Sequence, residues 1–182
     1  MKRFLFTVIM LSLSVCVLFA GGKKDRATNN GKPDVVAANF PAYDFARQIA
    51  GDTVNVYMLL PPGAESHSFE PAPRDIIRIQ NSAMFIYTGG ESDAWVDRIL
   101  ESMDTSKMRI VRMMDAVDLV EEEIVEGMEE EEEEEEGIAY DEHVWTSPKN
   151  AIRIVRAITG ALCEIDRANA ALFQKNAQSY IT

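Results

Sequence analysis

The sequence contains two histidines, His67 and His143, and each lies in a short segment suited to presenting a metal ligand. Histidine is the commonest protein ligand for zinc and related metals. Pro61-Pro62-Gly63 precedes His67, and Pro71 and Pro73 follow it, so that loop is stiff. Because the histidines are 76 residues apart, a shared site would have to be assembled by the fold.

The second histidine has a carboxylate and an aromatic residue close to it in sequence. Asp141 precedes His143 by two residues, and Trp145 follows it by two. If the segment is extended, the three side chains share one face, and Asp141 would orient the site as carboxylates near metal ligands do. A single histidine beside acidic residues is more often a surface or core residue with one hydrogen bond. Spacing alone therefore leaves the metal hypothesis open.

Strand-like and helix-like segments alternate along the part of the chain that holds these motifs. Apolar or β-branched runs predict strands at 35–40, 53–60, 84–87 and 108–113, and amphipathic segments predict helices at 43–50, 73–81 and 93–103. This alternation predicts an α/β fold, a parallel sheet with helices on both faces. Ligands of such sheets bind at the carboxyl ends of strands, and the His67 loop begins where the second strand ends.

Two further helices are expected after the second motif. Ser147-Pro148 is a strong helix start, and an apolar stripe follows at Ile154, Ile158, Leu162 and Ile165. Asp166 can cap the last helix, whose apolar face is expected to contain Leu172, Phe173, Ala177, Tyr180 and Ile181. That helix reaches the last residue without a stop signal. We interpret this as a sign of an incomplete sequence.

Composition is that of one globular domain of 182 residues, and its net charge of −12 is concentrated in one place. Twelve of the 30 acidic residues lie in 121–136, and the other 18 balance the 18 Lys and Arg. No basic stripe appears, so a nucleic-acid partner is not expected. Eight consecutive Glu predict a solvated, disordered loop over 121–137. Alternatively, this loop raises the local cation concentration near the site.

The N-terminus is typical of an exported protein. Residues 1–20 begin with Lys2 and Arg3 and continue as an apolar run, which predicts a signal segment. Cleavage after Ala20 and lipidation at Cys16 are both open, and an uncleaved anchor is a third alternative. Residues 21–33 are polar and predict a flexible tether. Cys163 is expected to be a buried small apolar residue, with no intramolecular disulfide.

Both histidine motifs resemble the bacterial solute-binding proteins of ABC transporters for zinc and manganese. In that family a proline-glycine loop carries a ligand histidine, then an aromatic residue and Glu-Pro, as in His67, Phe69 and Glu70-Pro71. Its Asp-x-His-x-Trp motif matches Asp141, His143 and Trp145, before the helix start at Ser147-Pro148. Further matches are the strand and glycine turn at 85–90, Trp95, the opening segment 36–49, and 166–170.

The resemblance implies a domain organisation and a ligand set. Residues 34–165 would form the N-terminal metal-binding lobe, and residues 166–182 the start of the helix that leads to a second lobe, which this chain lacks. His67 and His143 would be metal ligands, supported by Asp141. Glu65 is a further candidate, although the position directly before the histidine holds Ser66. The bound ion would be Zn²⁺ or Mn²⁺, and the second lobe would supply the remaining ligands.

The function implied is capture of a divalent ion outside the cytoplasmic membrane and delivery to a membrane permease. The protein would be a monomer, periplasmic or held on the outer face of the membrane by a lipid anchor, and would not be an enzyme. Two alternatives stay open. A metal-dependent hydrolase would need a general base beside a metal-bound water, and no HExxH-type motif is present. A surface lipoprotein with an adhesive or structural role is the other.

Overall fold

A computed structural model describes residues 31–64, 67–121 and 140–182 of the chain. The signal segment 1–20 and most of the tether and of the acidic tract lie outside the described residues. Among those described, no helix is long and apolar enough to cross a membrane.

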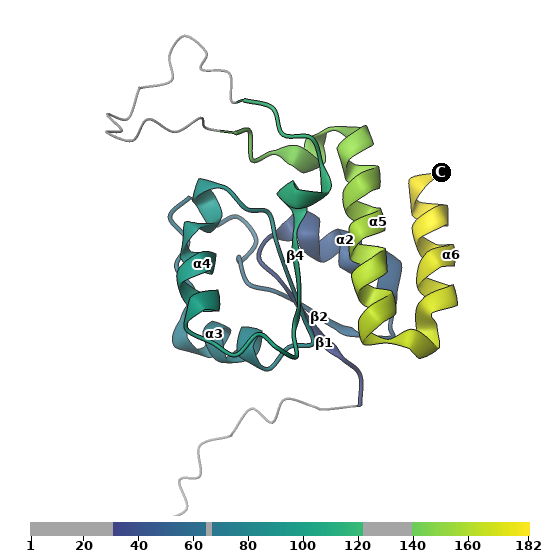
Figure 1. Ribbon diagram of the computed structural model, residues 1–182, viewed down its shortest axis with the longest axis horizontal. Coiled ribbons are helices and arrows are strands. Elements are labelled where there is room, and N and C mark those ends of the chain that lie inside the picture. The colour runs from purple at the N-terminus through teal and green to yellow at the C-terminus, as the bar shows by residue number, and fades with distance from the viewer. Residues whose placement is uncertain (1–30, 65–66, 122–139) are drawn as a thin grey trace, which may run out of the picture. The chain divides into compact units, whose positions relative to one another are not determined.

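The described residues form a four-stranded parallel sheet with helices on both faces, as the sequence predicts (Figure 1). The strand order is β2-β1-β3-β4. The strands are β1 (Asp34–Ala37), β2 (Asn55–Met58), β3 (Met84–Tyr87) and β4 (Arg109–Arg112). The helices are α2 (Phe40–Ala50), α3 (Pro73–Gln80), α4 (Ala94–Glu101), α5 (Pro148–Ile165) and α6 (Ala170–Ile181).

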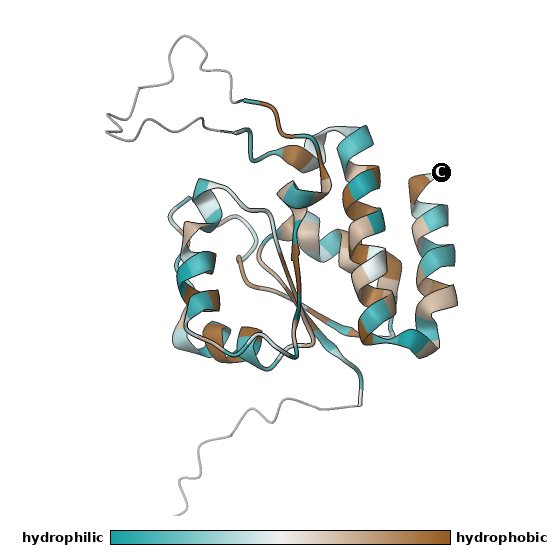
Figure 2. Cartoon of the chain, in the orientation of Figure 1, coloured by the Kyte–Doolittle hydropathy of each residue, from teal (hydrophilic) through white to brown (hydrophobic). Residues whose placement is uncertain are grey.

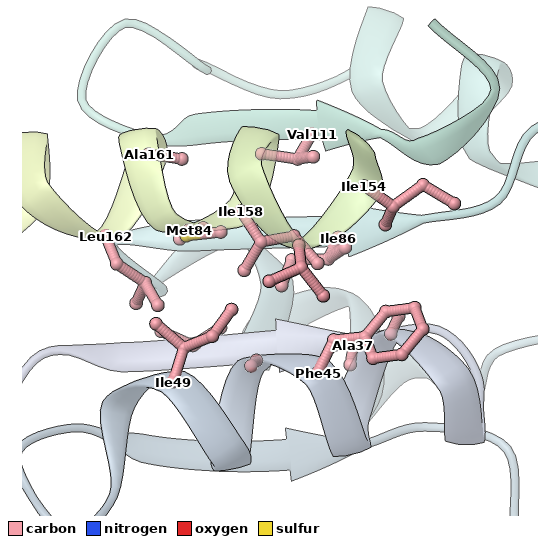
Figure 3. Close-up of a cluster of buried hydrophobic side chains, with 14 of the residues drawn as sticks. Ala37, Phe45, Ile49, Met84, Ile86, Val111, Ile154, Ile158, Ala161 and Leu162 are labelled. Carbon is pink, nitrogen blue, oxygen red and sulfur yellow. The ribbon is translucent and has the colours of Figure 1, made fainter. Parts of the chain in front are cut away.

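Alternate residues of each strand enter two separate cores, which is the pleat of a sheet covered on both sides. Val35 and Ala37 of β1 join Met84 and Ile86 of β3 in the core beneath α2, α5 and α6 (Figure 3). The neighbouring residues, such as Val36 and Phe85, enter the core beneath α3 and α4. Helices that follow β1 and β3 therefore lie on opposite faces of the sheet.

Helix α5 is held by the apolar stripe expected from its sequence. Ile154, Ile158 and Leu162 are fully buried, and Ile165 packs at the edge of the same core. The polar residues between them give the helix the two-sided colouring seen in Figure 2. Ser147 occupies the N-cap position and Pro148 the first turn, but the Ser147 side chain makes no capping hydrogen bond.

The first strand and helix differ from the sequence-based boundaries. The strand predicted over 35–40 ends at Ala37, and α2 begins at Phe40. The reason is Asn39, whose Oδ1 accepts a hydrogen bond from the Ala42 N–H at 3.3 Å and caps the helix. Pro41 then lies in the first turn, where a missing N–H has no cost.

The last helix also differs in part. A 3-10 turn (Arg167–Asn169) precedes α6, and Asp166 occupies the N-cap position of that turn without a side-chain capping hydrogen bond. Phe173 and Ala177 are buried as predicted, whereas Leu172 is 40% exposed and Tyr180 42% exposed. Tyr180 still packs edge to face against Phe45 of α2, with ring centroids 6.1 Å apart. Cys163 is only partly buried, and its Sγ lies 3.7 Å from the Ala170 carbonyl.

The two ends of the acidic tract are adjacent in the described residues. Glu121 and Tyr140 form an antiparallel bridge, and the Asp141 N–H donates to the Val120 carbonyl at 3.0 Å. The described residues on either side of 122–139 are therefore held together by hydrogen bonds.

This closure predicts that residues 122–139 are dispensable for folding. A two-residue Asn-Gly turn can join an antiparallel pair, and a shorter loop costs less entropy to close. A variant in which Asn-Gly replaces residues 122–139 should unfold cooperatively, with a melting temperature at or above that of the parent. Circular dichroism measures the transition. Loss of the cooperative transition would show that the tract contributes to the folded domain.

Candidate metal centre

A pocket lies beyond the carboxyl ends of the strands and contains both histidines. Segments that follow β1, β2 and β3 line it, together with the segment that begins at Tyr140. Its lining residues are Ala38, Asn39, Leu60, His67, Phe69, Thr88, Ser92, Asp93, Trp95, Glu142, His143 and Trp145. The connections from the adjacent strands β1 and β3 diverge to opposite faces of the sheet, which is the position where open α/β sheets bind ligands.

The first histidine is anchored by an aromatic residue two positions later. The rings of Phe69 and Trp95 meet edge to face, with centroids 5.8 Å apart. Trp95 is only 6% exposed and packs in the core beneath α3 and α4. His67 itself is exposed, and its Nδ1 lies 3.0 Å from the Ser92 Oγ. The contact to Ser92 therefore engages the Nδ1 atom of His67.

The second histidine is oriented by Asp141, and the extended arrangement considered from the sequence is not the one formed. A 3-10 helix (Val144–Thr146) starts directly after His143. The Asp141 Oδ1 accepts hydrogen bonds from the His143 N–H at 2.8 Å and lies 3.0 Å from its Nδ1. The backbone hydrogen bond, and then the imidazole, lower the pKa of Asp141. An ionised carboxylate only accepts, so the Nδ1 atom of His143 carries the proton.

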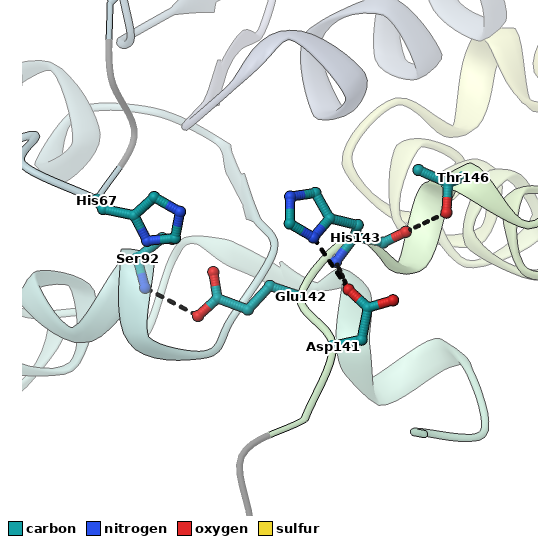
Figure 4. A network of polar contacts seen from close by, with 6 residues as sticks. All are labelled: His67, Ser92, Asp141, Glu142, His143 and Thr146. Carbon is teal, nitrogen blue, oxygen red and sulfur yellow. Dashed lines mark hydrogen bonds and ion pairs between the residues drawn. The ribbon is translucent and has the colours of Figure 1, made fainter. Parts of the chain in front are cut away.

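Both imidazoles thus line one pocket, and each has its Nδ1 engaged by a neighbouring side chain. In Figure 4 the Glu142 side chain extends between them. The His143 ring also packs against Trp145, with centroids 5.5 Å apart. The described residues contain no group of three or more His, Cys, Asp or Glu that could hold a metal ion. Glu65, the further candidate ligand, lies outside the described residues.

A buried carboxylate holds the glycine turn that forms one wall of the pocket. Asp93 Oδ2 accepts hydrogen bonds from the Thr88 N–H at 2.8 Å and the Gly89 N–H at 3.0 Å. Burial raises the pKa of Asp93, and the nearby Glu142 adds to this, while the two backbone hydrogen bonds and Arg112 oppose it. Gly89 and Gly90 have φ of +97° and +82°, a conformation that favours glycine.

Five polar residues of the pocket were not identified as site residues from the sequence: Asn39, Thr88, Ser92, Asp93 and Glu142. Ser92 and Asp93 follow a glycine pair at the end of a strand, which is a signal that could have been used. Glu142 stands directly before His143, and only the folded arrangement reveals that its side chain reaches the loop after β3.

The family model described as the periplasmic component A of the zinc-uptake complex matches residues 35–182. The chain belongs to this family. The description of the family as periplasmic agrees with the exported location expected from the sequence.

Two curated relatives and a solved structure are similar over most of this chain. The zinc-binding lipoprotein AdcA of Streptococcus pneumoniae is 33% identical over 175 residues, which cover 96% of this chain and 35% of AdcA. The high-affinity zinc uptake system protein ZnuA of Bacillus subtilis is 34% identical over 184 residues, which cover 97% of this chain and 56% of ZnuA. The Zn(II)-bound ZnuA-like domain of S. pneumoniae AdcA is 32% identical with a TM-score of 0.67, and the match covers 83% of this chain and 51% of that domain. This chain therefore spans about a third to a half of the length of these proteins.

Replacing Asp141 with Ala should change the tautomer of His143 in the metal-free protein. Without a carboxylate acceptor at Nδ1, the population with the proton on Nε2 should rise. Long-range ¹H–¹⁵N correlation spectra measure both ring nitrogens, and two histidines make assignment direct. An unchanged His143 spectrum would show that Asp141 does not set the tautomer; the His67 signals serve as the internal control.

Replacing Asp93 with Asn should change how stability depends on pH. The folded pKa of Asp93 is raised, so its stabilising contribution is fully present below the unfolded pKa and is lost as pH rises through the folded pKa. The unfolding free energy of wild type minus that of the variant should therefore fall as pH rises above about 4, the ordinary pKa of an aspartate. Urea unfolding at several pH values measures this, with exposed Asp97→Asn as control. A difference independent of pH would contradict the assignment.

Proposed function

We propose that this chain is the metal-capturing lobe of an extracytoplasmic solute-binding protein that collects Zn²⁺ and delivers it to the permease of an ABC transporter. The observation that carries the proposal is the convergence of the chain's two histidines on one pocket, each with its Nδ1 engaged. Imidazole nitrogen is a preferred ligand for zinc. The zinc-binding names of the relatives support zinc over manganese.

His67 and His143 would coordinate the ion through Nε2. Asp141 and Ser92 would fix the two rings by accepting or sharing the Nδ1 proton, as carboxylates and hydroxyls beside metal ligands do. Tetrahedral zinc takes four ligands. The family resemblance assigns the remaining ones to a second lobe, with α6 leading toward it.

Capture without catalysis is the activity that the pocket supports best. A hydrolase needs a carboxylate or imidazole placed to take a proton from a metal-bound water. Both described carboxylates that line the pocket accept backbone hydrogen bonds, Asp93 from the glycine turn and Glu142 from Ser92. We also propose a monomer, held outside the membrane by a lipid at Cys16 or released by cleavage after Ala20.

The test is zinc binding by this chain in titration calorimetry. With two ligands supplied, binding should be much weaker than nanomolar. Each of His67→Ala and His143→Ala should raise the Kd by more than about tenfold, the lower end of the effect of losing even a supporting contact. Exposed Gln80→Ala is the matched control. Unchanged binding in both histidine variants would refute the proposal and assign the zinc to another site, such as the acidic tract.

A further inference from the structure

Glu142 crosses from the segment that carries His143 to the loop after β3. Its Oε1 accepts a hydrogen bond from the Ser92 N–H at 2.9 Å, across 50 positions of sequence (Figure 4). Glu142 is partly buried, so this contact is shielded in part from solvent.

The glycine turn is shaped to admit this side chain. A Cβ added at Gly90 would lie 2.4 Å from the Glu142 Oε1 and 2.6 Å from its Cδ and Cγ. Any other residue at position 90 would therefore displace the carboxylate. Gly90 thus has two constraints, its positive φ and the space that Glu142 occupies.

Ser92 joins this contact to the other histidine. Its N–H donates to Glu142, while its Oγ lies 3.0 Å from the His67 Nδ1. A short path of polar contacts thus runs from Glu142, the residue directly before His143, through Ser92 to His67. This path connects segments that are far apart in sequence.

We propose that Glu142 is a positioning residue, a strut that fixes the His67 loop relative to His143 before a metal ion arrives. This inference rests on the proposed zinc function of the two histidines. Ordering loops on binding costs free energy, and a site already arranged avoids that cost. In the described residues no third ligand joins the two imidazoles in a metal-holding group, which favours a strut over a direct ligand.

The chemical test compares Glu142→Gln with Glu142→Ala. Gln keeps an acceptor oxygen on a side chain of the same length and removes the charge, so it should preserve the strut. We expect the Kd for Zn²⁺ of Glu142→Gln to stay within about twofold of the parent and that of Glu142→Ala to rise about tenfold, the size of other supporting-contact losses. Exposed Glu101→Gln and Glu101→Ala in α4 are the matched controls for charge.

A second readout follows the imidazoles without metal. Glu142→Ala should alter the ring ¹⁵N signals of His67, two contacts away, while Glu142→Gln and Glu101→Ala should not. In a double-mutant cycle, Ser92→Ala and Glu142→Ala should be non-additive for zinc affinity, because both break one path. Circular dichroism melts confirm that each variant is folded.

The outcomes separate the strut from its alternatives and from the zinc proposal itself. An equal loss of zinc affinity in Glu142→Gln and Glu142→Ala would show that Glu142 acts through its charge or as a ligand. That result would overturn the strut. Parent-like affinity and His67 signals in Glu142→Ala would also overturn it. If the histidine variants bind zinc as the parent does, the zinc proposal fails, whereas the His67 signals still report on the strut.

Discussion

β1 and β3 lie side by side at the centre of the sheet, and the chain leaves their carboxyl ends toward opposite faces. Their pairing runs from Val35 opposite Met84 to Ala37 opposite Ile86, all four fully buried. Because neither connection covers the gap between these strand ends, the edge there is open. The pocket with both histidines lies at this edge, so its existence depends on this one strand pairing.

Three further contacts fix the loops that line this pocket. Asp93 holds the glycine turn, Phe69 packs on buried Trp95, and Asp141 folds the backbone back onto His143. Each of these contacts acts on a loop rather than on a helix or strand. Loops have few neighbours of their own, so a few anchors decide where the imidazoles lie.

Local patterns in the sequence were enough to predict the strands and helices and to single out the two histidines as candidate ligands. The apolar run 84–87 is buried on both sides, as expected for a central strand of a parallel sheet covered by helices. The apolar stripe from Ile154 to Leu162 is the face of α5 that packs on this sheet. The resemblance added the ligand assignment, which spacing alone left open. A boundary set by a single side chain was missed, because Asn39 starts α2 earlier than expected. The backbone around His143 is fixed by the hydrogen bond to Asp141, which spacing alone does not predict. Ser92 and Glu142 were missed because their role depends on contacts between segments far apart in sequence, for which no local pattern exists.

The central claim is that His67 and His143 hold one zinc ion together through Nε2. A titration of the ¹⁵N-labelled chain with Zn²⁺, followed by the four ring nitrogens, tests it most directly. The Nε2 signals of both residues should shift together along one binding curve that fits one zinc per chain, while both Nδ1 atoms remain protonated. A shift in only one histidine, or saturation at different zinc concentrations for the two, would contradict it.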